Sequence, residues 1–545
     1  MRRFGGICRT LAAIVILSIA AFPALADTWV KAESEHFIVY SNVNAKAAEA
    51  YTRNLEKYRY VIGAFYRRAG EEEAPDPKLV LYFVNSRNDF QQIWPKVSSS
   101  VYGFVRICSN GMAGYSLYDG DRIRTAGKVQ NQEENVSQTI LFHEYAHLFM
   151  FQNSQVAYPR WFVEGFAEYY GTTKIQNDQA VIGMAWSGRV WGLQDSTILK
   201  WEDMLRDAPS TRKESASNDF YSQSWLLTHW ILFDPQRTAA FSTFLEARNK
   251  GVDGVEAFET AFGVPVKKLD GVLNAYMRSL KAMLYSFKGM PDPQITLSPM
   301  PASADKLMMW DSGVVACLSS DHEDSVLASI RKEVAKFPGD AYAQGVLARA
   351  EIVLGDEEKA LDYYKAQTAA NPRDAEAFFR LGQTWFLMTA HDKYAPGETR
   401  ESQMKKARLM LNKAYQLDPL NAVNLYYFSL TGTPGPNFPD ESTLNAAYEA
   451  HLLAPSVQEY ALHAANLLIQ KERFVEARRA LMPLANNPHG GAFSQWVASL
   501  VTAIEAGKSR DELLELMRTP VKTDDEDVKP GGDDKKSPEG KTKDK

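Results

Sequence analysis

The segment from Thr139 to Tyr170 is TILFHEYAHLFMFQNSQVAYPRWFVEGFAEYY, two apolar stretches separated by a connection that ends at Pro159. The first stretch contains the pattern H-E-x-x-H, formed by His143, Glu144 and His147. Residues four apart lie on the same face of an α-helix, so a helix here lets both imidazoles bind one ion. The intervening glutamate lies about 100° further round the helix, where its carboxylate can take a proton from a water molecule on that ion.

The second apolar stretch carries two glutamates one helical turn apart, Glu164 and Glu168, within WFVEGFAEYY. A catalytic zinc site is formed by three protein ligands and a water molecule, and a carboxylate from a neighbouring helix completes such a set. The two stretches together therefore predict a metal site of this type. The alternative is a buried pair of histidines beside a glutamate that has no part in metal binding.

The pattern H-E-x-x-H, followed by W-x-x-E-G-x-A with sixteen residues between His147 and Glu164, resembles the gluzincin metallopeptidases. The similarity is greatest to their aminopeptidase-like and peptidase MA-like branches, although the connection is a little shorter than in the best-known members. The resemblance implies that Glu164 is the third zinc ligand, and that Glu168 accepts a hydrogen bond from the outward nitrogen of His143. It extends over residues 27–290 and implies an α+β zincin-like metallopeptidase domain.

The remainder of this region predicts a mixture of strands and helices. Residues 36–41 and 78–84 have the composition of strands, and residues 45–66 have helical spacing. The resemblance further implies that an edge strand of the sheet pairs with an extended peptide substrate, and we expect that edge within residues 101–117. His36 is expected to have a structural role.

Residues 220–234, FYSQSWLLTHWILFD, resemble the aminopeptidase-like segment in which a tyrosine begins a long helix and faces the metal. This implies that Tyr221 donates a hydrogen bond to the oxyanion of the reaction, the alternative being an ordinary aromatic residue at a helix start. His229, eight residues later, is a second candidate, although a core histidine is the simpler interpretation. We also expect a hairpin over residues 181–193 and a helical region from residues 198–205.

The first 26 residues have the features of a secretory signal peptide: basic residues, an apolar run over residues 11–22 and a small-residue cleavage site. No other stretch is long and apolar enough to span a membrane, so export across the inner membrane to a bacterial periplasm is expected. Removing Arg2, Arg3 and Arg9 with this segment lowers the formal net charge from −6 to −9. Such a charge gives no indication of nucleic-acid binding.

Three cysteines are present, of which Cys8 lies in the predicted signal peptide. In an oxidising compartment Cys108 and Cys317 can form a disulfide, or they can remain two buried thiols, and the sequence leaves both open. Neither is expected to bind zinc, because no second cysteine lies nearby.

Beyond a predicted proline-containing linker, residues 291–322, proline recurs with spacings of 34, 47, 36 and 33 residues. The prolines are Pro338, Pro372, Pro419, Pro455 and Pro488. This period, with small and aromatic residues at matching positions in the first two units, predicts tetratricopeptide-like helical repeats over residues 323–518. Such repeats stack into an all-α solenoid whose concave surface either binds a peptide or protein partner or serves only packing. Residues 519–545 are expected to form a disordered charged tail.

These patterns predict an exported zinc-dependent metallopeptidase with a peptide or protein substrate. Zinc bound by His143, His147 and Glu164 activates a water molecule, from which Glu144 removes a proton, and Tyr221 stabilises the oxyanion. Cleavage at a chain end and cleavage within a chain both remain open. One alternative is a catalytically silent peptidase-like and repeat scaffold in the cell envelope, against which the intact general base argues. Another is hydrolysis of a non-peptide envelope component.

Overall fold

The computed structural model describes eleven stretches of the chain. They are residues 29–64, 76–99, 101–118, 136–153, 158–185, 199–208, 211, 217–318, 322–433, 435–487 and 490–519. The predicted signal peptide and nearly all of the predicted charged tail lie outside them. Among the helices of these stretches, none combines the length and the apolar character needed to cross a bilayer.

The N-terminal part is built on a mixed six-stranded sheet in the order β4-β5-β3-β2-β1-β9. Its strands are β1 (Val30–Glu33), β2 (Phe37–Ser41), β3 (Leu79–Val84), β4 (Gly103–Cys108), β5 (Gly111–Leu117) and β9 (Thr296–Pro299). β3 pairs in parallel with β2 and β5, whereas the other neighbours are antiparallel. β4 forms one edge of the sheet, within the predicted residues 101–117.

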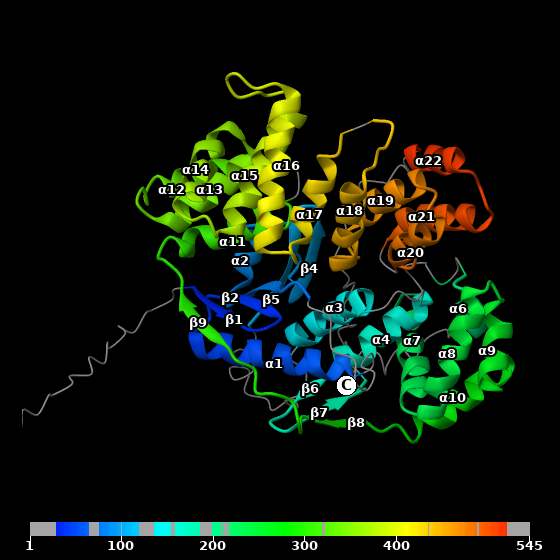
Figure 1. Ribbon diagram of the computed structural model, residues 1–545. Coiled ribbons are helices and arrows are strands. Elements are labelled where there is room, and N and C mark those ends of the chain that lie inside the picture. The colour runs from blue at the N-terminus through cyan, green and yellow to red at the C-terminus, as the bar shows by residue number, and fades with distance from the viewer. Residues whose placement is uncertain are drawn as a thin grey trace, which may run out of the picture.

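Alternate residues along the middle strands face two different cores, as the two-residue repeat of a strand requires. On β3, Leu81 and Phe83 belong to a core with α1 (Ala45–Gly63) and α3 (Val136–Asn153). Tyr82 and Val84 face the opposite core, with α11 (Ala304–Val315) and the two helices that follow it. The sheet therefore lies between α1 and α3 on one side and α11 on the other (Figure 1).

Further helices and a small second sheet complete this part of the chain. The helices are α2 (Arg87–Gln91), α4 (Arg160–Gly171), α6 (Trp201–Leu205), α7 (Ser217–Leu232), α8 (Pro235–Asn249), α9 (Gly254–Phe262) and α10 (Leu269–Met277). The second sheet has the order β6 (Lys174–Ile175), β7 (Gln179–Ile182) and β8 (Met283–Ser286). The hairpin expected over residues 181–193 is therefore displaced: β6 and β7 form a hairpin that ends at residue 182, and residues 186–193 lie outside the described residues.

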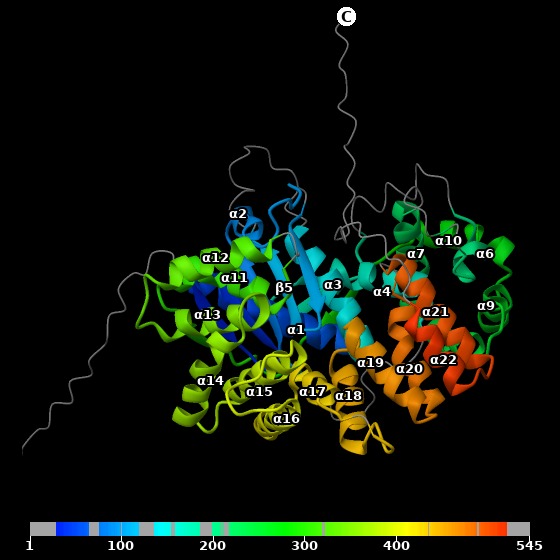
Figure 2. The ribbon, with the colours of Figure 1, turned by 90° about the horizontal axis from the view of Figure 1, so that it is seen from above.

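The C-terminal part is helical, and it curves along one side of the sheet and its helices (Figure 2). Its helices are α12 (Glu323–Val334), α13 (Ala341–Leu354), α14 (Glu358–Ala370), α15 (Ala375–Ala390), α16 (Arg400–Leu417), α17 (Ala422–Leu430), α18 (Glu441–Leu453), α19 (Gln458–Gln470), α20 (Phe474–Ala485), α21 (Gly491–Glu505) and α22 (Arg510–Arg518). Pro338, Pro372, Pro419 and Pro455 each lie in the connection before the next helix, where proline is tolerated. A mixed α and β part followed by a helical part is thus confirmed, while the zincin and tetratricopeptide assignments stay predictions.

The segment predicted as a linker, residues 291–322, holds two ordered elements. β9 pairs with β1 at the sheet edge, and α11 packs on the sheet. Pro299 ends β9, and proline is compatible with such a strand because an edge strand need not donate to a further neighbour. Cys317, just after α11, forms a disulfide with Cys108 at the end of β4, so the alternative of two thiols is excluded in this structure.

Candidate metal centre

Two buried helices carry the predicted site residues. His143, Glu144 and His147 lie in the middle of α3, and Glu164 and Glu168 lie on α4. α3 packs between the sheet and α4 and is apolar over most of its surface, as expected for a helix none of whose residues is fully exposed. The predicted helical spacing of the H-E-x-x-H residues is confirmed.

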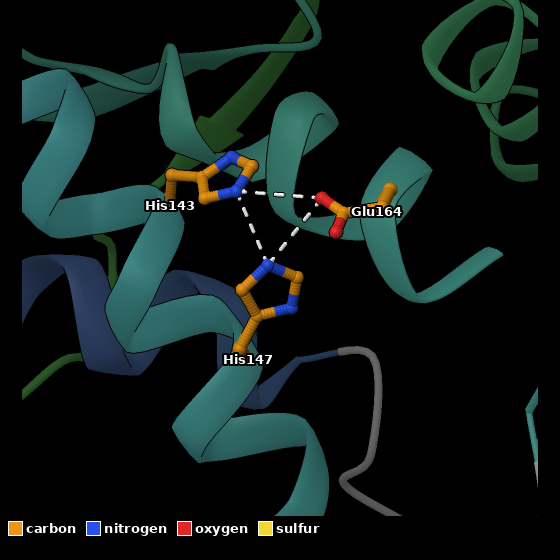
Figure 3. Close-up of side chains that lie close together, drawn as sticks. All are labelled: His143, His147 and Glu164. Carbon is orange, nitrogen blue, oxygen red and sulfur yellow. Dashed lines mark hydrogen bonds and ion pairs between the residues drawn. The ribbon is translucent and has the colours of Figure 1, made fainter. Parts of the chain in front are cut away.

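The three predicted ligand atoms come together in a small triangle (Figure 3). The Nε2 atoms of His143 and His147 are 3.1 Å apart, and they lie 3.5 and 3.6 Å from Oε2 of Glu164. A tetrahedral ion with ligands at about 2.0–2.1 Å requires ligand atoms about 3.4 Å from one another. The triangle therefore has the dimensions that a single tetrahedral ion needs.

This is the one group of at least three histidine, cysteine, aspartate or glutamate side chains, within the described stretches, whose ligand atoms all approach within 4.8 Å. Two imidazoles and one carboxylate suit Zn²⁺, and they also suit other divalent first-row ions. The geometry thus fits a divalent metal ion, and the donor set alone does not select zinc.

The charges around His143 favour a cation. Burial by itself lowers the pKa of His143, but the carboxylates of Glu164, Glu168 and Glu144 outweigh burial and raise that pKa above its usual value. The same negative potential that favours a proton on the imidazole favours a divalent cation beside it. Glu164 has no exposed surface, so its charge is placed in a region of low dielectric constant where it acts strongly.

Glu168 lies behind His143. Its Oε1 atom is 3.6 Å from Nδ1 of His143, the ring nitrogen that points away from the triangle, which is an ion-pair distance longer than a hydrogen bond. The hydrogen bond that the resemblance implies stays a prediction. A carboxylate in this place selects the tautomer whose Nε2 carries the free lone pair, which is the atom that a metal ion would use. The fifth predicted residue, Glu144, is partly buried, and its charge acts on His143 from the neighbouring position of α3.

No protein-family model matches the chain, and no curated protein matches it.

Two glycines let α4 approach its neighbours closely. A Cβ atom at Gly171 would lie 3.1 Å from Cβ of His143 and 3.3 Å from its Cα, so this glycine sets the separation of α4 and α3 at the first ligand. A Cβ atom at Gly165, the residue after Glu164, would lie 2.8 Å from the carbonyl carbon of Ser224 on α7, and closer still to the oxygen. The glycine of the E-G-x-A pattern thus has a packing role that the sequence did not reveal.

Tyr58 of α1 is a supporting residue that the sequence analysis missed. Its ring stacks on Phe142 with 3.8 Å between ring centroids, and its hydroxyl donates to the Phe142 carbonyl at 2.8 Å. Phe142 precedes the first ligand, so α1 fixes the position of α3 at the site. Nothing distinguishes Tyr58 in the sequence from other tyrosines in helices, because its partner is 84 residues away.

Tyr221 lies in the first turns of α7 and is partly buried. Ser224 and Thr228 of α7 contact α4 at Gly165. Tyr221 lies three positions before Ser224 and seven positions before Thr228, and residues with these spacings share one side of a helix. Tyr221 therefore lies on the side of α7 that faces α4, and its part in oxyanion stabilisation stays a prediction.

Two other histidines are structural. His229 is 1% exposed, its Nδ1 atom lies 2.8 Å from the hydroxyl of Tyr276, and burial lowers its pKa to about 4. These properties agree with the simpler interpretation of His229, that it is a core histidine. The backbone N–H of His36 donates to Glu56 at 2.9 Å, and its Nδ1 lies 2.8 Å from the same carboxylate, which ties the start of β2 to α1.

Proposed function

We propose that this protein is a zinc-dependent metallopeptidase of the gluzincin type. The observation that carries the proposal is the triangle of His143, His147 and Glu164, with Glu144 beside it on α3. In this proposal residues 27–290 form a zincin-like domain, and residues 323–518 form tetratricopeptide-like repeats. The chain acts after export to the periplasm.

The distances in the triangle support the proposed ligand roles. The Nε2 atoms of the two histidines and Oε2 of Glu164 hold the zinc, and Glu168 keeps the proton of His143 on Nδ1. When bound, zinc supplies the positive charge that lowers the pKa of a water molecule towards about 7 and polarises a carbonyl.

The remaining residues move protons and stabilise charge. Glu144 accepts the proton of the attacking water on its carboxylate and transfers it to the leaving amine. The phenol of Tyr221 donates a hydrogen bond to the oxyanion that develops on the substrate carbonyl. β4, the sheet edge next to α3, offers backbone groups to an extended peptide substrate.

Metal content tests the ligand set directly. We expect about one zinc ion per purified wild-type chain by elemental analysis, and a large loss in Glu164→Ala, because a two-histidine site lacks the third ligand. Glu256→Ala is the matched control, since Glu256 is an exposed glutamate on α9. Wild-type protein that binds no zinc after reconstitution would overturn the proposal.

Turnover tests the general base separately. Glu144→Gln should retain zinc but lose about 100-fold or more of the peptidase activity on a broad peptide mixture, because the amide cannot accept the proton. Glu256→Gln should behave as the wild type. Normal cleavage by Glu144→Gln would refute the mechanism, and a zinc-loaded wild type that cleaves no peptide would favour the scaffold or a non-peptide substrate.

A further inference from the structure

The turn between β4 and β5 is attached to the end of α11. Cys108, the last residue of β4, forms the disulfide with Cys317, and the two Cα atoms are 6.2 Å apart. A Cβ atom at Gly111, the first residue of β5, would lie 3.3 Å from the carbonyl oxygen of Val315. The two residues that begin and end this turn therefore both lie against residues 315–317, where α11 ends.

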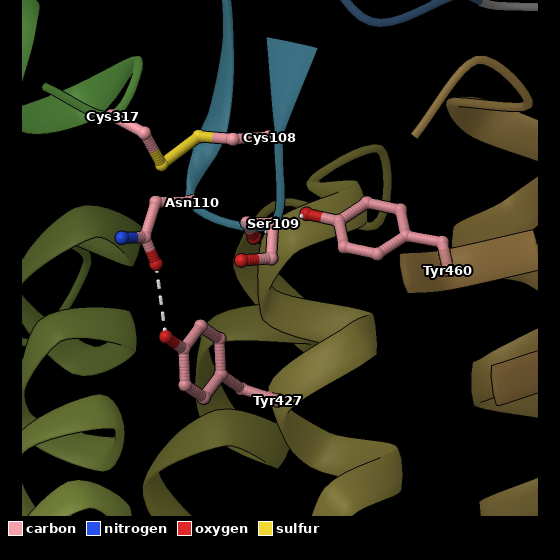
Figure 4. Close-up of a disulfide and its surroundings, with 6 residues drawn as sticks. All are labelled: Cys108, Ser109, Asn110, Cys317, Tyr427 and Tyr460. Carbon is pink, nitrogen blue, oxygen red and sulfur yellow. Dashed lines mark hydrogen bonds between the residues drawn. A yellow bond between two sulfur atoms is a disulfide. The ribbon is translucent and has the colours of Figure 1, made fainter. Parts of the chain in front are cut away.

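The two residues between them are held by helices much later in the chain. The hydroxyl of Tyr460 on α19 donates to the carbonyl of Ser109 at 2.8 Å. The hydroxyl of Tyr427 on α17 donates to Oδ1 of Asn110 at 2.9 Å (Figure 4). Residues 108–111, which we call the hairpin tip, are thus held at four consecutive positions, the outer two by the end of α11 and the inner two by the helical part.

The backbone at Cys317 has the left-handed conformation in which many helices end. Its φ is +54°, two residues after the last residue of α11, so the disulfide joins the hairpin tip to the terminus of this helix.

The opposite end of the hairpin is attached to the metal-site helix. The hydroxyl of Ser137, in the first turn of α3, donates to the carbonyl of Tyr102 at 2.8 Å, directly before β4. The same hydroxyl accepts from the backbone N–H of Leu117 at the end of β5. The edge strand is therefore fixed to α3 at one end and to the helical part at the other.

We propose that the helical part acts as a redox-sensitive latch on the edge strand β4. With the disulfide closed, the hairpin tip stays between α11, α17 and α19, and β4 is held straight beside α3. With the disulfide open, only non-covalent contacts hold the tip, chiefly the two tyrosine hydrogen bonds and the packing of Gly111 on Val315, and β4 opens more often. Opening of β4 would weaken the binding of a peptide substrate. This consequence rests on the proposed function, in which β4 is the strand that pairs with the peptide.

The opening step is an ordinary thiol–disulfide exchange. A dithiol reductant gives two electrons and two protons to the Cys108–Cys317 bond, which becomes two thiols, while the reductant becomes a disulfide. Both cysteines are partly exposed, so a small dithiol or a reducing protein can reach the bond. The metal triangle comes from α3 and α4 and contains no atom of the hairpin, so we expect the metal to remain bound.

Hydrogen exchange on the full mature chain, with and without a dithiol under native conditions, tests the latch. Reduction should speed amide exchange in residues 103–108 by about tenfold or more, and leave α1 unchanged, since local opening follows the local restraints. Zinc content, measured in the same samples, should not change. Peptide turnover, if the proposed function holds, should fall in parallel with the loss of protection in β4.

Tyrosine variants test the non-covalent half of the latch without touching the cysteines. The double variant Tyr427→Phe, Tyr460→Phe keeps both rings and removes both hydroxyls. In its reduced form the amides of β4 should therefore exchange faster than in the reduced wild type. Tyr415→Phe, at an exposed tyrosine of α16, is the control and should have no effect.

Three results would overturn the latch: free thiols at Cys108 and Cys317 in protein purified without reductant, exchange in β4 that is unchanged after reduction, or exchange that rises equally throughout the chain. The last result would mean that the disulfide only adds global stability. If reduction speeds exchange in β4 as expected but the protein cleaves no peptide, the latch is supported and the proposed function is refuted.

Discussion

Replacing Gly165 by alanine should both destabilise the fold and disturb the metal site. The added Cβ atom would lie 2.8 Å from the carbonyl carbon of Ser224, and nearer to that carbonyl oxygen and to the hydroxyl of Thr228. Ordinary carbon contacts are about 3.5–4.0 Å, so α4 and α7 must separate by roughly 1 Å at this point. The obstacle is backbone as well as side chain, so rotation of one side chain cannot relieve it.

The size of the effect follows from that displacement. Overpacking of a well-filled core costs about 1–3 kcal/mol, and the upper end applies here because both helices are buried at the contact. Glu164 precedes Gly165, and metal ligands tolerate errors of only about 0.2 Å, so the affinity for zinc should also fall. Adding Thr228→Ala to Gly165→Ala removes the hydroxyl but should restore little of the lost stability, since the Ser224 carbonyl remains in place.

Chemical denaturation and elemental analysis measure the two effects. Gly165→Ala should lower the free energy of unfolding by about 3 kcal/mol and reduce bound zinc. Gly271→Ala is the matched control: Gly271 is an exposed glycine inside α10, with no atom within 4 Å of the added Cβ. Alanine there should stabilise the protein by about 0.5–1 kcal/mol through helix propensity. A Gly165→Ala protein as stable as the wild type, with its full zinc content, would refute this account of α4 packing.

Two further predictions concern the helical part. Burial lowers the pKa of His451 to about 4, whereas the unfolded chain titrates near its ordinary value of about 6.5. Between these values the unfolded state binds the extra proton, so the free energy of unfolding should fall as the pH is lowered from 6.5 to 4. One such group contributes up to about 1.4 kcal/mol per pH unit to this change. Chemical denaturation at several pH values should therefore show that the free energy of unfolding of His451→Leu depends less steeply on pH than that of the wild type. An equally steep dependence would contradict the prediction. A chain truncated to residues 27–290 should show no cooperative thermal unfolding, because it lacks β9 and the helices that cover the second face of the sheet. Residues 27–370, which include them, should unfold cooperatively. Cooperative unfolding of the shorter chain but not of the longer one would refute this prediction.

The local chemistry of the site was predictable from the sequence, because it depends on spacing within single helices. H-E-x-x-H and the later glutamate pair each need only a helical period to place their side chains. Their meeting across α3 and α4 follows from the motif, but the glycines that permit it do not, since Gly165 contacts residues about 60 positions later. Four prolines of the period, Pro338, Pro372, Pro419 and Pro455, also lie in helix connections as predicted, because proline is unfavourable in the interior of a helix, whereas Pro488 lies outside the described residues.

Features that depend on contacts between distant segments were not predictable. Cys108 and Cys317 are 209 residues apart, and only the folded structure places α11 beside the end of β4. The four-residue strand β9 is too short to show a periodic pattern, and the prolines in and around it suggested a linker. In both cases the partner that gives the segment its structural role lies far away in the chain, so the local pattern left the disulfide open and wrongly suggested a linker.

The sheet connects the site to the helical part through neighbouring residues of one strand. On β5, Gly114 faces α3, where a Cβ atom would lie 3.4 Å from Leu141. The next residue, Tyr115, faces the opposite core, and its hydroxyl donates to Ser312 of α11 at 3.2 Å. Because one strand packs on both α3 and α11, the change in sequence character near residue 290 does not separate two independent structures. The candidate metal site is positioned from one face of a sheet whose other face is completed by the helical part.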